Sequence, residues 1–244
     1  MYEIAMYDPV KVLAAMDVNR VPISIVFGFG MLFSNLWYIV TVRDARRDRV
    51  ISMPLFVSAT WLVHDGSYIL NFQHWFAMGH WFPTFFWFSL LPIFIIEIIW
   101  VWQNIDYGRK EFYPWINGRN YTLGVMGVIA CAAAGWALLK WFINDPLYLI
   151  SMYLTVSYYP AMSLAMIVRR RTSQGQSKLL WVCFILNFVP WTIVSYLWWG
   201  GGVFRGLPHV IYGMVVIASA IVVLTVLSRL PASASTGDGV KLHE

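Results

Sequence analysis

The 244-residue chain is 59% hydrophobic and only 12% charged, a composition that places it among membrane proteins and indicates a single domain. Its formal net charge of +5 comes largely from arginines in short loops between apolar stretches. This distribution is typical of a multispanning membrane protein and argues against a nucleic-acid-binding surface. We therefore expect the lipid bilayer as a partner, and no nucleic acid.

Aromatic residues make up 18% of the chain, more than a bundle that only faces lipid requires. Part of them is expected at the two membrane–water interfaces. The remainder could line an internal cavity for an apolar ligand, because aromatic side chains offer large apolar surfaces. The two cysteines, Cys131 and Cys183, lie in apolar runs. We expect both to be buried small side chains rather than a disulfide or metal pair.

Seven apolar stretches are long enough for membrane-spanning helices, which need about 20 residues each. We expect them at 21–42, 51–72, 84–104, 121–143, 147–168, 179–199 and 207–227. Residues 1–20 should form an interfacial or short amphipathic segment. The fold class is thus an all-α membrane protein, with one seven-helix transmembrane domain over residues 1–228 and a flexible cytoplasmic tail over 229–244.

Basic residues predict the orientation of these spans. They lie mainly in the loops after the first, third and fifth spans, beginning with a tight basic loop at 43–49, whereas the loop at 73–83 has neither lysine nor arginine. The positive-inside rule then places the N-terminus outside and the C-terminus in the cytoplasm. We expect an integral protein of a bacterial inner membrane or of an endomembrane, and the sequence leaves its oligomeric state open.

The second span carries polar side chains, including His64, Asp65, Tyr68 and Asn71. An ionisable group inside a bilayer costs roughly 2.5–3.5 kcal/mol on insertion scales, so it is expected to face the bundle interior. Asp65 shares a helix face with Trp61 and Tyr68, because residues three and four apart stack on one side. Asp65 is either a tether to another helix or a proton donor and acceptor, and its place inside a span favours the second interpretation.

Glu97 is the second candidate acid, in the middle of the third span with Trp100 on the same face. It is either a general acid that burial keeps protonated or a neutral side chain bonded to a carbonyl. Asn35, Tyr159 and Asn187 of other spans could add polar or aromatic walls. Three prolines lie inside predicted spans and could kink their helices: Pro92, Pro160 and Pro190. Kinked helices occur both in transporters and in proteins with an internal cavity, so these prolines do not discriminate between the two.

Histidine spacing gives no metal site. His64, His74, His80 and His209 include no pair with tight metal-ligand spacing, so we expect no metal and no cofactor. A single histidine bound to haem is the remaining alternative. A retinal chromophore would need a lysine in the last helix, and residues 207–227 contain none.

A family resemblance begins at Met53-Pro54-Leu55 and the tryptophan that follows at Trp61. Together with Gly28-Phe29-Gly30-Met31, the segment 35–38 and the basic loop after it, these motifs resemble the small seven-helix transmembrane terpene cyclases of fungal meroterpenoid and indole-diterpene pathways and their bacterial relatives. The resemblance implies that a prenyl epoxide or alkene is protonated and cyclised in an aromatic pocket, without a metal.

The chain departs from that family at its acids. The family has a glutamate directly after the tryptophan, where this chain has Leu62, and an acidic residue in the last helix, where 213–227 contains none. This chain therefore lacks both carboxylates of the family at their usual positions. Asp65 and Glu97 could take their place as the pair of acids.

These observations predict a membrane enzyme that acts on a hydrophobic, isoprenoid-type small molecule by acid-initiated cyclisation, epoxide opening or isomerisation. Asp65 would be the acid, Glu97 its partner and His64 a proton relay. The substrate-binding wall would consist of Trp61, Tyr68, Trp100, Asn35, Tyr159 and Asn187, with the aromatic rings stabilising positive charge through cation–π contacts. Two alternatives stay open: a small transporter or ligand-binding protein whose buried acids are ligand or proton sites, and a haem-dependent isomerase.

Overall fold

The computed structural model describes residues 6–231, and every regular element in this range is a helix. In chain order these are α1 (Pro9–Val18), α2 (Arg20–Asp48), α3 (Leu55–Leu70), α4 (Phe72–Ala77), α5 (Trp81–Gln103), the π-helical turn η1 (Asn104–Gly108), α6 (Arg109–Phe112), α7 (Gly118–Phe142), α8 (Leu149–Thr155), α9 (Tyr158–Arg170), α10 (Lys178–Trp198), α11 (Gly202–Arg205) and α12 (Leu207–Arg229). The tail predicted at 229–244 lies, from residue 232 onward, outside the described residues.

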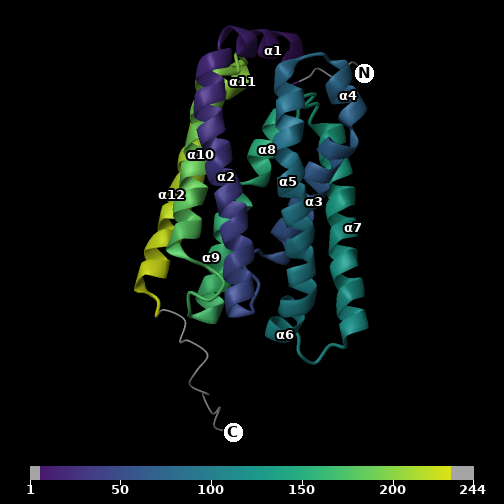
Figure 1. Ribbon diagram of the computed structural model, residues 1–244, viewed down its shortest axis with the longest axis vertical. Helices are drawn as coiled ribbons and strands as arrows, with labels where there is room; N and C mark the ends of the chain where they lie inside the picture. The colour runs from purple at the N-terminus through teal and green to yellow at the C-terminus, as the bar shows by residue number, and fades with distance from the viewer. Residues whose placement is uncertain (1–5, 232–244) are drawn as a thin grey trace.

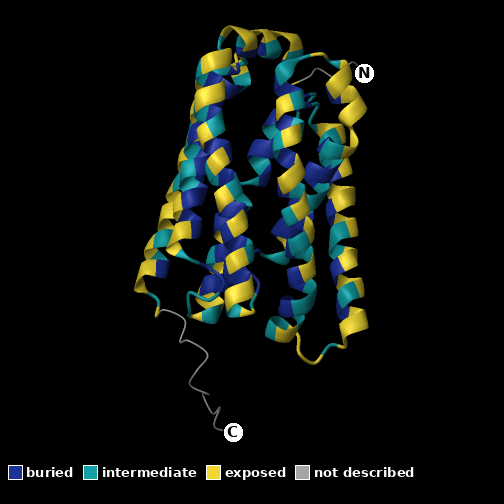
Figure 2. Ribbon diagram, in the orientation of Figure 1, coloured by how far each residue is buried: buried dark blue, intermediate teal, exposed yellow. Residues whose placement is uncertain are grey.

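The long helices lie side by side in one bundle, with α1 across one end and the end of α12 at the other (Figure 1). Exposed residues cover the outer faces of the helices, and buried residues turn inward (Figure 2). The most extensive helix contact joins α2 and α10. A Cβ added at Gly30 would lie 3.1 Å from Pro190 Cβ and 3.3 Å from the Asn187 carbonyl oxygen, so the glycine allows the close approach that is typical of membrane helices.

Five helical segments of the described chain are long and apolar enough to cross a membrane: α2, the continuous stretch Trp81–Phe112, α7, α10 and α12. The predicted all-α class is therefore confirmed, and helix length and composition fit a membrane protein. The second and fifth predicted spans differ from these five. α3 has 16 residues, about 24 Å of helix at 1.5 Å per residue, and the stretch predicted at 147–168 is divided between α8 and α9.

The basic stretch after the first span is helical, although the sequence predicts a loop at 43–49. α2 continues to Asp48 and ends at Arg49, whose φ is 57°. Asp44 is fully buried and accepts hydrogen bonds from Arg43 Nη2 at 2.8 Å and Arg47 Nη1 at 3.3 Å. The prediction was wrong because alternating arginines and aspartates neutralise one another along this helix. The two loops predicted around the third span are also partly helical, forming α4, η1 and α6.

The break between α8 and α9 follows from Pro160, which has no N–H to donate and lies in the first turn of α9, where helices tolerate proline. The Tyr159 N–H bonds to the Val156 carbonyl rather than to that of Thr155. The Thr155 carbonyl instead accepts a hydrogen bond from Trp61 Nε1 at 2.8 Å. Pro92 and Pro190, by contrast, lie inside the continuous helices α5 and α10.

Asp145 fastens the N-terminal segment to the start of α8. Its carboxylate is 1% exposed and accepts hydrogen bonds from the Tyr7 hydroxyl, the Leu149 N–H, and both the N–H and the hydroxyl of Ser151. Burial, and then the adjacent Asp145 charge, raise the pKa of the Tyr7 phenol well above its usual range. Tyr7 therefore stays protonated and remains a donor at physiological pH.

Asp145→Ala should lower the free energy of unfolding by about 3 kcal/mol, because it leaves several buried donors without their charged acceptor. Thermal unfolding followed by circular dichroism in detergent micelles would measure the loss. Asp8→Ala is the matched control, since Asp8 is an exposed N-cap of α1 worth about 1 kcal/mol. Equal stability of the two variants would contradict a structural role for the Asp145 cluster.

Candidate active site

An internal cavity of about 70 Å³ lies between α2, α3, α5, α8 and α10. Its aromatic lining consists of Trp37, Tyr38, Trp61, Phe86, Phe188 and Trp191, and its polar lining includes Ser34, Asp65, Tyr153, Thr155 and Asn187. α12 contributes no residue to this lining. A cavity of this size has room for a few water molecules, or for one end of a larger molecule.

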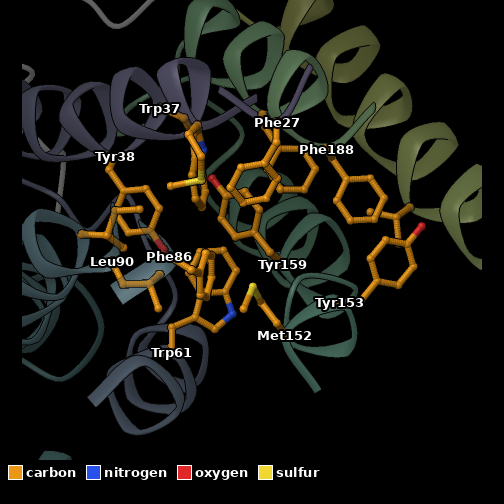
Figure 3. Packing of buried hydrophobic residues seen from close by; sticks show 14 of the residues in the cluster. Phe27, Trp37, Tyr38, Trp61, Phe86, Leu90, Met152, Tyr153, Tyr159 and Phe188 are labelled. Atoms are coloured by element: carbon orange, nitrogen blue, oxygen red, sulfur yellow. The ribbon is translucent and has the colours of Figure 1, made fainter. Parts of the chain in front are cut away.

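Trp37 is the centre of the aromatic wall. Its ring meets five others edge-on, with centroid distances of 4.7–5.9 Å, from Tyr38, Trp61, Trp100, Tyr159 and Phe184. Figure 3 shows Trp37, Tyr38, Trp61 and Tyr159 converging from three different helices. Edge-to-face packing of this kind holds the rings in fixed orientations, so the cavity has a rigid wall of π-systems.

Asp65 lies on the face of α3 that borders the cavity, where it is 6% exposed. Its Oδ1 is 2.5 Å from Nδ1 of His64, the residue before it in the chain. His64 is 1% exposed and packs edge-on against Trp136 of α7, with ring centroids 4.7 Å apart. The imidazole therefore lies behind Asp65 as seen from the cavity, in a position to exchange a proton with its carboxyl group.

Glu97 reaches the same place from α5 and is fully buried. Its Oε1 accepts a hydrogen bond from the Tyr38 hydroxyl at 3.1 Å. Asp65 is the charged group that acts most strongly on Glu97, and the second carboxyl oxygen of Glu97, Oε2, is buried without a hydrogen-bond partner among the described residues. The structure thus brings together the two acids that the sequence singles out, although they are 32 positions apart in the chain.

Two carboxyl groups that lie close together in a protein interior repel one another when both are charged, because little water screens them. A proton shared between the two groups would relieve this repulsion. A buried acid that borders a cavity is what general acid catalysis requires. His64 and Tyr38 complete the group, one on each side of the pair.

The predicted substrate-binding residues divide into two sets. Trp61 and Asn187 line the cavity, and the Asn187 Oδ1 is buried without a hydrogen-bond partner among the described residues. The other four lie behind or beside the lining: Tyr68 stacks on Trp75, Trp100 stacks on Tyr38, Tyr159 stacks on Trp181, and Asn35 bonds to the Met31 carbonyl. Trp100 and Tyr159 therefore support the wall through its second layer of rings.

Sequence reasoning missed the contribution of α2. Met31, Ser34, Trp37 and Tyr38 all line the cavity, whereas the sequence singles out only Asn35 of this helix as a candidate wall residue. Their spacing of three, three and one places them on one face, and a polar serine and tyrosine on a mostly apolar face were the available signal. Glu97, the hydrogen-bond acceptor of Tyr38, belongs to another helix. The spacing of residues along α2 could not predict this pair.

The described residues contain no group of three or more histidine, cysteine, aspartate or glutamate side chains that could hold a metal ion. His209 bonds through Nε2 to Ser195 Oγ at 2.8 Å and stacks on Tyr153. His74 and His80 lie at the end of the bundle near α4 and α5. His64 is thus the histidine placed beside the candidate acids.

Comparison with known proteins gives no relative for this chain: no protein-family model, no curated protein and no solved structure matches it.

Proposed function

We propose that this protein is an integral membrane enzyme that acts on an apolar, isoprenoid-type molecule by acid-initiated cyclisation, epoxide opening or isomerisation. The observation that carries the proposal is the position of Asp65 at the wall of an aromatic cavity, beside His64 and with the buried Glu97 acting on it from α5. The resemblance of 28–61 to the transmembrane terpene cyclases is consistent with this reaction class. The two acids lie in α3 and α5, so the reaction would use carboxyl groups at positions that differ from those of the terpene cyclase family.

The reaction starts with proton transfer from the Asp65 carboxyl group to an epoxide oxygen or an alkene carbon. For an epoxide, the new O–H bond forms as the C–O bond breaks, and the electron pair of a neighbouring alkene closes a ring on the resulting carbocation. The final cation loses a proton, which returns to the carboxylate pair. His64 Nδ1 can stabilise the Asp65 carboxylate between these steps. No bound cofactor is needed for this balance of protons and electrons.

The aromatic wall would stabilise the cationic intermediates. Tryptophan and tyrosine faces attract a cation within about 6 Å by 0.5–2 kcal/mol each, with the larger value in a desolvated site. Trp37, Tyr38 and Trp61 all border the cavity that Asp65 faces. The same wall excludes bulk water, which would otherwise capture a carbocation before the ring closes.

We also propose that the chain crosses the membrane seven times, with α3 and the pair α8–α9 completing the five long segments. α3 packs against α5, α7, α8 and α9 inside the bundle, and the first and last described helices end at opposite ends of it (Figure 1). Most lysines and arginines lie at the end where α2, α6 and α12 finish, which supports an external N-terminus and a cytoplasmic C-terminus. A bacterial inner membrane or an endomembrane fits this arrangement.

A test of the function begins with the protein purified in mild detergent. Mass spectrometry of co-purifying small molecules should find a terpenoid or a prenylated lipid, and the absorption spectrum should lack a Soret band. Incubation with farnesol carrying a terminal epoxide should then give products of unchanged mass and altered retention in gas chromatography, because cyclisation is an isomerisation. Unchanged epoxide with native protein, alongside a heat-denatured control, would contradict the proposal. A Soret band would favour the haem-dependent alternative.

The break between α8 and α9 favours one second candidate, a small transporter. Interrupted helices beside a buried polar site are common in secondary transporters, and this break borders the cavity at Thr155 and Val156. The buried acids would then carry protons or bind the transported molecule. Uptake of a labelled ligand into proteoliposomes, driven by a pH gradient and without chemical change in the ligand, would identify a transporter.

A further inference from the structure

A second hollow lies on the outside of the bundle, next to the candidate active site. This groove has a volume of about 570 Å³ and runs between α3, α7 and the α8–α9 break. Residues that line it include Phe56 and Thr60 of α3, Gly127, Cys131 and Trp136 of α7, and Tyr158 of α9. Its wall is therefore almost entirely apolar, on a helix whose surface is mostly exposed (Figure 2).

The small residues of α7 keep this groove open. A Cβ added at Gly124, Gly127 or Gly135 would meet nothing within 4 Å. Glycines in membrane helices commonly allow two backbones to approach closely, but here no neighbour approaches. Cys131, which the sequence predicts to be buried, is exposed for the same reason. These positions thus hold a space between α7 and the rest of the bundle.

The groove and the cavity are separated by a thin partition. Thr155 lines both hollows, while the adjacent residues Thr60 and Trp61 line the groove and the cavity respectively. The hydrogen bond from Trp61 Nε1 to the Thr155 carbonyl, 2.8 Å long, closes this partition. The carbonyl is free to accept it only because α8 ends there. This bond holds the Trp61 indole on the side of the cavity that Thr155 shares with the groove, and Asp65 lines the same cavity.

The two hollows complement each other in size and polarity. The groove falls within the range of roughly 300–1,000 Å³ that is usual for sites of small organic ligands, whereas the cavity of about 70 Å³ accepts only one end of such a molecule. The cavity also holds a buried, unpartnered acceptor, Asn187 Oδ1, which points to a ligand group or water at its inner end. The groove offers almost only apolar surface.

We propose that the groove is the entrance to the cavity from the bilayer and the binding site for the apolar chain of the substrate. The molecule is a linear prenyl chain that enters sideways from the lipid, displaces the Trp61 indole, and places its reactive end at Asp65 while the rest of the chain stays against α7. This inference rests on the proposed function for the identity of the ligand. It explains how a small cavity serves a long substrate.

Photolabelling tests this placement. Farnesol carrying a diazirine on its chain is incubated with the protein in lipid nanodiscs, irradiated, and located by mass spectrometry of peptides. Labels are expected between residues 124 and 139 of α7 and at Tyr158. Gly127→Leu should lower this labelling about tenfold, the equivalent of 1.4 kcal/mol of binding, because its side chain enters open space and fills the groove.

Two matched variants isolate the groove. Gly127→Ala gains helix propensity in the same way but adds only a methyl group, so its labelling should stay near that of the original protein. Ala137→Leu places the same leucine side chain at an exposed position of α7 outside the groove and should leave the labelling unchanged. None of the three variants should unfold at a lower temperature than the original protein, since a Cβ at Gly127 meets nothing within 4 Å and Ala137 is exposed.

The outcomes separate this inference from the proposed reaction. Labels spread evenly over both faces of α7, or labelling that survives Gly127→Leu, would overturn the groove as the chain-binding site. Labelling confined to the groove and lost in Gly127→Leu supports it, whether or not the terminal epoxide of farnesol is converted. Failure of that conversion in the original protein would instead count against the proposed reaction.

Discussion

Asp65→Asn should lower the turnover of an epoxide-bearing prenyl substrate by about a thousandfold, within the range that a positioned general acid contributes. Asparagine has nearly the same shape as aspartate and can still bond to His64, but it has no acidic proton to transfer. The chemical step would lose its proton donor while the aromatic wall stays in place. Initial rates measured by gas chromatography on protein in nanodiscs would show the loss.

Two further variants make this result specific to the acid pair. Glu97→Gln should also lower turnover strongly, because an amide at that position can neither share a proton with Asp65 nor return one to it after the reaction. Asp106→Asn should leave turnover unchanged, since Asp106 pairs with Lys110 in η1 and α6, away from the cavity. Full activity of Asp65→Asn, with unchanged thermal unfolding, would remove Asp65 from the mechanism.

Trp37→Ala should lower the free energy of unfolding by about 3–5 kcal/mol, the usual cost of truncating a large buried aromatic side chain. Trp37 is 1% exposed and contacts five other rings from α3, α5, α9, α10 and its own helix. Its removal would leave a void where these helices meet. Thermal unfolding monitored by circular dichroism in detergent would report the loss of stability.

Leu36→Ala provides the control for this variant. Leu36 precedes Trp37 on α2 but is 40% exposed, so its truncation should change stability by no more than about 0.5 kcal/mol. The two variants remove side chains from the same turn of the same helix. If Trp37→Ala and Leu36→Ala unfold at the same temperature, the aromatic cluster around Trp37 is not the centre of the core.

Helix positions in this protein were largely predictable from apolar stretches. The first and last predicted spans, 21–42 and 207–227, fall inside α2 and α12, because a run of about 20 apolar residues has few alternatives in a membrane. The ends were less predictable. α2 extends through its arginines because their partners, Asp44 and Asp48, lie in the same helix, and hydropathy alone does not register such pairs.

The candidate site was predictable on α3 but not across helices. Asp65 stood out because an ionisable residue inside an apolar stretch is costly in a membrane and usually has a function. The structure places it at a cavity. Its nearness to Glu97 depends on the packing of α3 against α5, which no periodicity encodes. Asp145 was missed for the opposite reason: it follows an apolar helix in what looks like an ordinary turn, and its role depends on Tyr7, 138 residues away.

The absence of α12 from the cavity lining has a consequence for how this sequence can drift over generations. Substitutions along most of α12 alter only lipid contacts and helix packing, so one apolar residue can replace another there without touching the chemistry. Gly213 is an exception, because a Cβ at that position would lie 2.6 Å from the Tyr153 hydroxyl and 2.7 Å from Thr192 Cγ2. Descendants of this chain should therefore vary most on the exposed face of α12, while Gly213 and His209 of that helix, and α2 and α3, change slowly.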